Sequence, residues 1–395
     1  MKGVLPVIVI SQFFCTSLWF AGNAIVPDII QAYHLDPSFL VHLTSAVQFG
    51  FISGTLVFAV LSIADRFSPS KVFFICSIIA ATFNLGIIMN GIDSSMLLFF
   101  RFFTGFFLAG IYPVGMKIAS DHFSKDLSKS LGFLVGALVL GTAFPHLLKS
   151  IGSTFPWKYV ICTTSLLSVI GGVLILSFVP DGPYRVLGNK MNLSAFVSGF
   201  KNKDFRSASF GYFGHMWELY TFWAFVPVML TSFNSRISNS EINIALWSFI
   251  IIASGGLSCV CGGLLARKFG SKIIATICLS FSGLCCFLSP LFLMCDNAYL
   301  LLGFLFFWGL VVIADSPLFS TLVAQHAPQR SRGSALTVVN CIGFSITIIS
   351  IQFINIISAS VGAQYLYLFL AVGPLLGVIA LLNRNRASEE IISQL

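Results

Sequence analysis

The fold follows from a stretch that occurs twice in the chain, ADRFSPSK at residues 64–71 and ARKFGSK at residues 266–272. Each copy is a short basic turn between two long apolar segments, and the copies lie about 200 residues apart. Repetition of such segments is the signature of a duplicated membrane-spanning unit. The chain is therefore expected to consist of two related, membrane-embedded halves.

The composition excludes a soluble domain of ordinary surface chemistry, because 57% of the 395 residues are hydrophobic and only 9% are charged. Largely apolar stretches of roughly 20 or more residues recur along the whole length, each able to cross a hydrocarbon core of about 30 Å. They predict an all-α membrane protein with twelve transmembrane helices in two pseudo-symmetric six-helix bundles. The expected spans are residues 5–31, 39–63, 71–90, 94–119, 130–149, 158–179, 206–231, 243–266, 272–294, 298–324, 333–355 and 363–382.

Lysines and arginines mark the expected orientation. With both termini in the cytoplasm, 18 of the 22 lie in or beside cytoplasmic loops. Three, Lys149, Lys158 and Arg236, lie on the outer side, and the last, Arg101, lies inside the fourth span. Short basic loops are retained on the cytoplasmic side, so this distribution predicts a multi-pass protein with both termini cytoplasmic. It also accounts for the net charge of +8 without a nucleic-acid partner.

A polar stretch, PDGP at residues 180–183, separates the two halves. In the fourth expected span Gly105 precedes Pro113 by eight residues, and in the tenth Gly309 precedes Pro317 by eight, an offset of 204 in both cases. We expect an N-terminal bundle at residues 1–180, a cytoplasmic linker at 181–205, a C-terminal bundle at 206–382 and a cytoplasmic tail at 383–395.

Other classes of function lack their motifs. The ten cysteines have no metal-type spacing and are expected to be small core residues, so neither a metal nor a cofactor is predicted. HExxH, GxSxG and Walker A patterns do not occur, which argues against an enzyme and an autonomous ATP-driven pump. A passive channel stays open as an alternative, although it leaves buried charged residues such as Arg101 and Glu218 harder to explain.

On these turns and spans, the chain resembles the major facilitator superfamily over essentially its whole length. That family has the pattern GxLADRxGRK between its second and third spans. The matching residues are Ala64, Asp65, Arg66 and Lys71 in the first copy and Gly263, Leu265, Ala266, Gly270 and Lys272 in the second. Arg267 stands where the family has Asp. The resemblance implies secondary transport by alternating access and a one-sided conformational latch in which Asp65 accepts hydrogen bonds from a neighbouring helix N-terminus. The expected latch residues are Asp65, Arg66, Lys71, Gly263 and Gly270.

Within this family, the PDGP stretch and residues 211–223 look similar to bacterial members grouped with nitrate/nitrite or cyanate permeases. Nitrate carriers of that group use one arginine in the second span and another in the eighth. Neither span contains an arginine here, which argues against nitrate. The fifth span matches the family's antiporter motif only in part, at Gly132 and Gly141, while Pro145 comes one residue early. The direction of transport therefore stays open.

Four ionisable residues inside the spans are the candidates for proton coupling: Arg101, His215, Glu218 and Asp315. Burying a charge in the membrane is costly, so such residues are expected to face the bundle interior and to serve transport. His215 and Glu218 are three residues apart and are expected to act as a pair, with Glu218 as the group that takes up the proton. Arg101 opens an RxxxG pattern that looks like the family's second motif and is expected to face a cavity or a carboxylate. Asp315 has two interpretations, a proton or cation site, or a structural partner of Arg101 or Arg332.

Polar and aromatic residues on the inner faces are the candidates for substrate binding, because uncharged hydrogen-bonding groups line cavities of this kind. They are Gln12, Trp19, Asn23, Gln48, Tyr112, Trp217, Tyr220, Trp247 and Asn340. The leading hypothesis is a proton-coupled carrier of a small polar or anionic metabolite, with a proton-driven efflux pump for drugs or siderophores as the alternative. Its expected partners are the solute, protons and membrane lipids, and we expect a monomer in the bacterial inner membrane.

Overall fold

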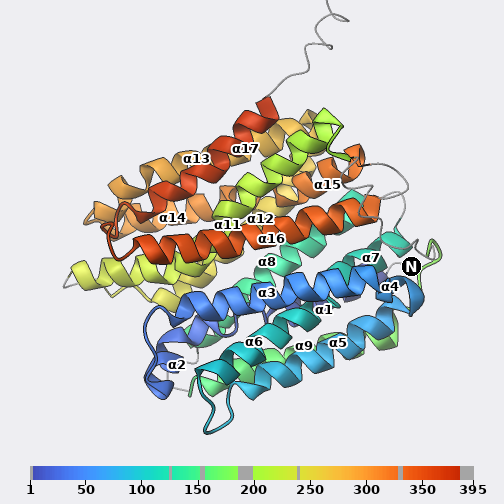
Figure 1. Cartoon of the computed structure of the whole chain (residues 1–395), viewed down its shortest axis with the longest axis horizontal. Coiled ribbons are helices and arrows are strands. Elements are labelled where there is room, and N and C mark those ends of the chain that lie inside the picture. The colour runs from blue at the N-terminus through green and yellow to red at the C-terminus, as the bar shows by residue number, and fades with distance from the viewer. Residues whose placement is uncertain are drawn as a thin grey trace, which may run out of the picture.

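The computed structural model describes residues 3–123, 127–151, 156–185, 199–237, 241–327 and 332–382, and all regular structure in these ranges is helical. Figure 1 shows two groups of helices that run side by side, one coloured blue to green and the other yellow-green to red. The prediction of an all-α membrane protein is confirmed. Nine helices in the described ranges are long and apolar enough to cross a membrane, counting each of two broken pairs as one, and two shorter apolar helices accompany them.

The N-terminal group consists of α1 (Val4–Thr16), η1 (Asn23–Ile25), α2 (Val26–Tyr33), α3 (Phe39–Val60), α4 (Ile63–Arg66), α5 (Pro69–Gly86), α6 (Ser94–Leu108), α7 (Tyr112–His122), α8 (Leu127–Ile151) and α9 (Lys158–Phe178). The C-terminal group consists of α11 (Lys203–Arg236), α12 (Ile244–Phe269), α13 (Ser271–Met294), α14 (Ala298–Val311), α15 (Ser316–His326), α16 (Arg332–Ile357), η3 (Leu366–Ala371) and α17 (Val372–Leu382). Eleven of the twelve predicted spans coincide with one helix or one broken pair, and the first, residues 5–31, coincides with α1, η1 and α2. Much of the predicted linker, and the whole tail at 383–395, lie outside the described residues.

Two spans break at the prolines that repeat in the sequence. Pro113 lies in the first turn of α7 and Pro317 in the first turn of α15. Proline lacks the N–H that an interior helix position needs and clashes with the preceding turn, so it stops one helix and starts the next. Each half therefore contains one bent span at the same place in its repeat.

The paired glycines in these bent spans have matching surroundings. A Cβ atom at Gly105 would clash with the carbonyl of Val47 on α3, and one at Gly309 would clash with the carbonyl of Ile251 on α12. The two carbonyls are also 204 residues apart. Small residues allow such close helix approach in membranes, so the repeat is preserved at the level of packing.

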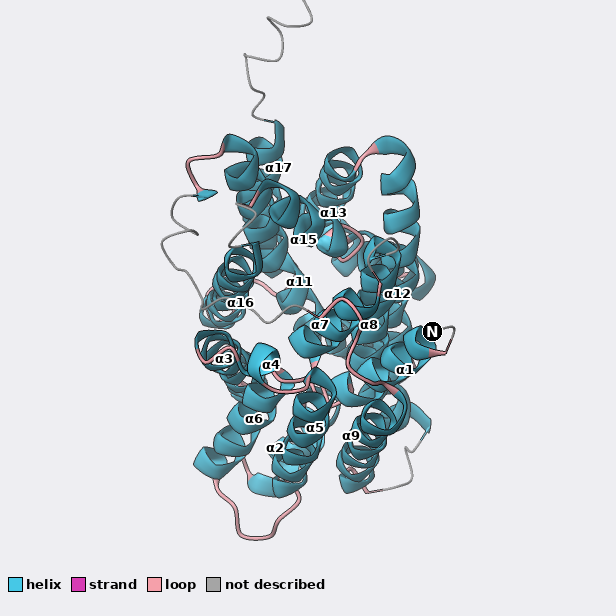
Figure 2. Ribbon diagram, turned by 90° about the vertical axis from the view of Figure 1, so that its right-hand side faces the viewer, coloured by secondary structure: helices cyan, strands magenta, loops and turns pink. Residues whose placement is uncertain are grey.

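The two groups meet along two pairs of helices, α8 with α12 and α3 with α16, and Figure 2 shows the bundle from the end that carries the N-terminus. Three hydrogen bonds join the groups within the described ranges. Gln352 donates to Ser45 Oγ at 3.0 Å, Asn243 donates to Ser150 Oγ at 3.3 Å, and Thr347 Oγ1 donates to Gln48 Oε1. All three lie in the half of the bundle remote from the N-terminus, because α3 and α12 begin there and α8 and α16 end there.

Candidate functional site

Glu218 lies in the middle of α11 and is fully buried. Its Oε1 accepts a hydrogen bond from Trp308 Nε1 on α14 at 2.5 Å, and its Oε2 accepts one from Ser282 Oγ on α13 at 2.8 Å. Both donors are neutral, and among the described residues no cation lies within ion-pair distance of this carboxyl group. A buried carboxylate without a counter-charge is costly, so this carboxyl group is placed where a proton would remove that cost.

The Ser282 hydroxyl has two partners, of which it can serve one at a time. Besides Glu218, it lies 3.1 Å from the carbonyl oxygen of Leu279 in its own helix. A hydroxyl carries one hydrogen and two lone pairs. With Glu218 ionised, Ser282 donates to the carboxylate; with Glu218 protonated, the carboxyl O–H donates to Ser282, which then donates to Leu279. Both protonation states of Glu218 are satisfied without movement of the helices.

His215 does not pair with Glu218 as expected, although the two share α11. Its Nδ1 lies 2.9 Å from Asp315 Oδ1, and both side chains are buried. Asp315 immediately precedes α15, and its carbonyl accepts from the amides of Leu318 and Phe319 in the first turn. The two groups are within ion-pair distance, and by strict geometry no aligned hydrogen bond joins them. The expected structural partners of Asp315 were Arg101 and Arg332. The neighbour in the structure is His215 instead of Arg101, and the side chain of Arg332 lies outside the described residues.

Among the residues that the structure describes, the hydrogen-bond partners of Arg101 on α6 are neutral oxygens. Its guanidinium donates to the carbonyl of Leu18 at 3.1 Å, to the carbonyl of Trp19, and to Asn84 Oδ1 at 3.3 Å. These carbonyls belong to the non-helical segment between α1 and η1, where the first span is interrupted. The expectation of a cavity or carboxylate partner is thus not met in this conformation, and Arg101 instead satisfies backbone groups freed by a helix break.

Aromatic rings from both groups fill the centre of the interface. The ring of Trp19 lies 4.7 Å from that of Phe51, 5.9 Å from Tyr220 and 5.7 Å from Phe344. Phe20 reaches across to Trp223 at 6.3 Å. The halves are therefore in direct contact at mid-depth.

Several buried N–H groups in and near this interface have no hydrogen-bond partner among the described residues. They are Trp19 Nε1, Trp223 Nε1, Gln48 Nε2 and Gln12 Nε2. Nearly all buried polar groups in native proteins are paired, so these unpaired donors are candidate contacts for a solute. Trp223 was not predicted as a site residue, yet it follows Trp19 by the same offset of 204 that relates the glycines and prolines, a signal that was available in the sequence.

The predicted substrate-binding residues separate into two sets. Trp19, Gln48 and Tyr220 come together around Phe344. Trp217 faces the other way and donates to the Phe369 carbonyl at 3.1 Å.

The remaining members lie apart from that set, except Tyr112, which is half-buried and lies near Tyr212 and Tyr220. Asn23 donates to Thr44 at 2.7 Å within the N-terminal group, and Gln12 packs beside Gly115 of α7. Trp247 and Asn340 are half-buried.

The expected latch does not bridge the two halves. Asp65 pairs with Lys117 at 3.0 Å, and Arg185 donates to the carbonyls of Asp65 and Phe67, so these contacts stay between residues 65 and 185. Arg66 and Lys71 form no ion pair within the described ranges.

Gly263 and Gly270, the expected latch residues near the second basic turn at residues 266–272, have surroundings that differ from each other. A Cβ at Gly263 would meet open space, and Gly270 has a φ of 90°, a conformation that favours glycine. Gly270 therefore serves the tight turn from α12 to α13.

Comparison with known proteins gives one family. A family model described as Major Facilitator Superfamily matches residues 8–351, and a further match to the same model covers residues 208–394. A comparison with curated proteins finds no match.

Proposed function

Because this chain belongs to the Major Facilitator Superfamily, and is accordingly a multi-pass membrane protein and a secondary transporter, we propose that it couples proton movement to the transport of a small polar or anionic metabolite. Transport follows alternating access, in which the two bundles rock about a site between them. The proposal includes a monomer in the bacterial inner membrane with both termini in the cytoplasm, as the positions of Lys and Arg favour.

One observation carries the proton coupling: Glu218 has hydrogen-bond partners for both of its protonation states. Trp308 donates in either state. Ser282 donates its hydroxyl hydrogen to Glu218 when the carboxyl group is ionised and to the Leu279 carbonyl when it is protonated. A carboxyl group that is hydrogen-bonded in both protonation states can gain and lose a proton repeatedly, as a coupling residue must.

The substrate class is argued from the unpaired groups between the bundles. Trp19, Trp223 and Gln48 each present an unpaired N–H donor there, which suits a solute with acceptor oxygens. We also propose membership of the nitrate/nitrite or cyanate permease group from the PDGP stretch and residues 211–223, which would agree with a small polar anion. The arginines that nitrate carriers use are missing from the second and eighth spans.

A proton-driven efflux pump for drugs or siderophores is the second candidate. The ring cluster around Trp19 and Phe344 favours it, because stacked aromatic surfaces bind planar organic molecules. Accumulation assays in cells with and without the gene distinguish the two directions, since loss of an exporter raises the intracellular level and loss of an importer lowers it.

The test of the proposal begins with a thermal-shift screen of the purified protein against a metabolite library to obtain a substrate. Vesicles containing Glu218→Gln should then lose accumulation driven by a pH gradient and keep exchange of labelled for unlabelled substrate, because the amide mimics the protonated carboxyl group. Normal gradient-driven accumulation by this variant would remove Glu218 from the coupling role.

A further inference from the structure

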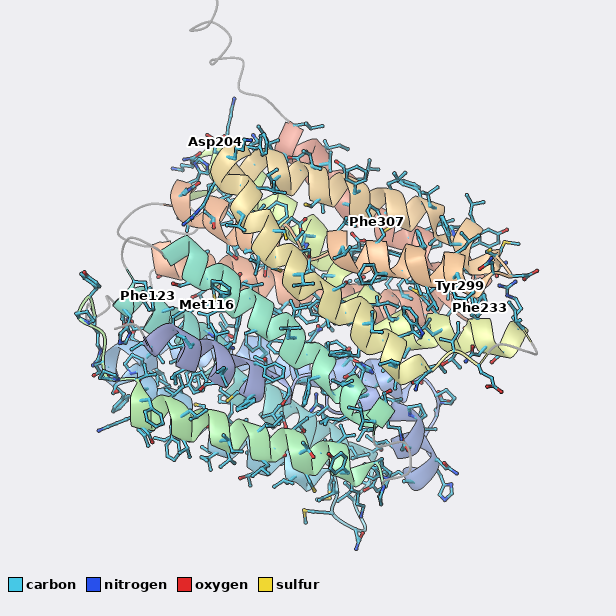
Figure 3. The ribbon with its side chains drawn as sticks, turned by 180° about the vertical axis from the view of Figure 1, so that it is seen from behind. Met116, Phe123, Asp204, Phe233, Tyr299 and Phe307 are labelled. Atoms are coloured by element: carbon cyan, nitrogen blue, oxygen red, sulfur yellow. The ribbon has the colours of Figure 1, made fainter. Side chains whose placement is uncertain are left out.

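A groove lies between α13 and α14 on the outside of the C-terminal group, away from the interface. It encloses about 340 Å³ and is lined by Leu284, Leu288 and Phe292 of α13 and by Leu300, Gly303 and Phe307 of α14. This volume falls within the range of roughly 300–1,000 Å³ that is usual for ligand sites. Figure 3 shows two of its residues along one helix, Tyr299 towards the end and Phe307 nearer the middle.

The surroundings of the groove identify its occupant. Leu284, Leu300 and Phe307 are 47%, 53% and 44% exposed, so in a membrane protein they face the hydrocarbon of the bilayer. From Leu284 to Phe292 the groove follows eight residues of helix, about 12 Å at 1.5 Å per residue. One leaflet contributes about half of the 30 Å hydrocarbon core, roughly 15 Å, so the groove covers most of the depth of one leaflet.

Charged residues lie at one end of the groove. α13 ends at Met294, two residues beyond Phe292, and there Arg236 pairs with Asp296 at 2.6 Å. Arg236 also donates to the carbonyls of Leu293, Met294 and Cys295. Charged groups belong at the headgroup level, so the groove starts there and runs inward.

The floor of the groove leads to Glu218. Phe304 stacks on Phe292 with ring centres 4.2 Å apart and planes 3° from parallel, and its ring lies 5.5 Å from that of Trp308. Trp308 is the residue that donates to Glu218, and Ser282, the second donor, lies on the same α13 that forms the other wall. The two helices that form the groove are thus the two that hold the carboxyl group.

From these observations we propose that the groove binds an acyl chain of a membrane phospholipid, which fixes the spacing of α13 and α14 and so positions Trp308 and Ser282 on Glu218. The bound chain is a structural ligand and is distinct from the transported solute. The site depends on membrane insertion and does not depend on the coupling role of Glu218.

The experiment uses the full-length protein in vesicles of phosphatidylethanolamine and phosphatidylglycerol that contain a phosphatidylcholine with a photoreactive diazirine in mid-chain. Gly303→Leu fills the groove, and a Cβ at Gly303 meets no atom within 4 Å, so the variant is expected to fold. Leu291→Phe is the matched control, because Leu291 is 69% exposed on α13 and does not line the groove.

We expect photolabelling to concentrate on residues 284–307 in the wild type and in Leu291→Phe, and to fall at least fivefold there in Gly303→Leu. Labelling spread evenly over all lipid-facing helices, or unchanged by Gly303→Leu, would overturn the proposal. A second measurement covers the case in which a variant misfolds: addition of phosphatidylglycerol to the delipidated wild type in detergent should raise its melting temperature by several degrees. Absence of any such rise would equally refute a specific site.

Discussion

At the scale of single residues, the candidate chemistry depends on which neighbour each buried polar group meets. Sequence spacing correctly identified Glu218, His215, Asp315 and Arg101 as buried, since charged residues in apolar spans must face inward. It could not identify their partners. His215 and Glu218 lie three residues apart on one helix, but the surrounding helices separate them, one contacting α15 and the other α13 and α14.

Ser282 is the residue on which the proton-exchange argument depends most directly. Ser282→Ala removes the hydroxyl that serves both states of Glu218, so gradient-driven uptake should fall at least tenfold, whereas Ser282→Thr, which keeps the hydroxyl, should retain most of it. Counterflow, which needs no proton movement, should survive in both variants. Equal uptake by the alanine and threonine variants would show that the hydroxyl is not needed.

Arg101 should act chiefly on stability. Arg101→Ala leaves the carbonyls of Leu18 and Trp19 and the amide oxygen of Asn84 without their donor, and each buried unpaired group costs about 1–3 kcal/mol. The melting temperature in detergent should therefore fall by many degrees. Arg101→Lys replaces the planar guanidinium with a single ammonium group, so it should recover only part of the lost melting temperature. An unchanged melting temperature with abolished transport would instead assign Arg101 to the transport chemistry.

At the scale of helices, the sequence predicted the presence and order of the spans well. It predicted the positions at which helices are interrupted less well. All twelve spans are present because twenty-residue apolar stretches have few alternatives in a membrane. The span predicted to end at residue 63 stops at Val60, because Ser62 takes a left-handed conformation with φ of 51° and starts the short α4. The break in the first span, at residues 17–22, was also missed. This segment contains no proline, and its freed carbonyl groups accept hydrogen bonds from Arg101 on a different helix.

The two glycines of α14 allow a matched test of close helix packing. A Cβ at Gly309 would meet the Ile251 carbonyl, whereas one at Gly303 meets nothing. Gly309→Ala should therefore destabilise the protein by about 1–3 kcal/mol through overpacking, and Gly303→Ala should be neutral or slightly stabilising. Thermal unfolding of the two variants side by side measures the difference. Equal melting temperatures would show that α12 and α14 can separate without cost.

At the scale of the whole molecule, the halves are held together remote from the N-terminus by Ser45–Gln352, Gln48–Thr347 and Ser150–Asn243. The duplication was visible in the sequence, but the conformation was not, because a carrier visits several arrangements with the same helices. The predicted latch at the basic turns illustrates this limit, since Asp65 contacts only its own half here.

Alternating access requires that the contacts remote from the N-terminus separate during each cycle. A double variant, Ser45→Cys with Gln352→Cys, places two thiols where a hydrogen bond now joins α3 and α16. A short bis-methanethiosulfonate reagent should cross-link the pair and reduce transport to background, and a reducing agent, which cleaves the mixed disulfides, should restore it. The two single variants are the controls for the ten native cysteines. Full transport by the cross-linked protein would mean that this end never opens.

The hydrogen bonds between the halves have one more consequence, which follows from their lack of charge. Amide and hydroxyl groups feel little of the shielding that dissolved ions exert on an ion pair. Each such bond contributes only about 0.5–1.5 kcal/mol net. The strength of these three contacts should therefore stay nearly the same in dilute water and in brine.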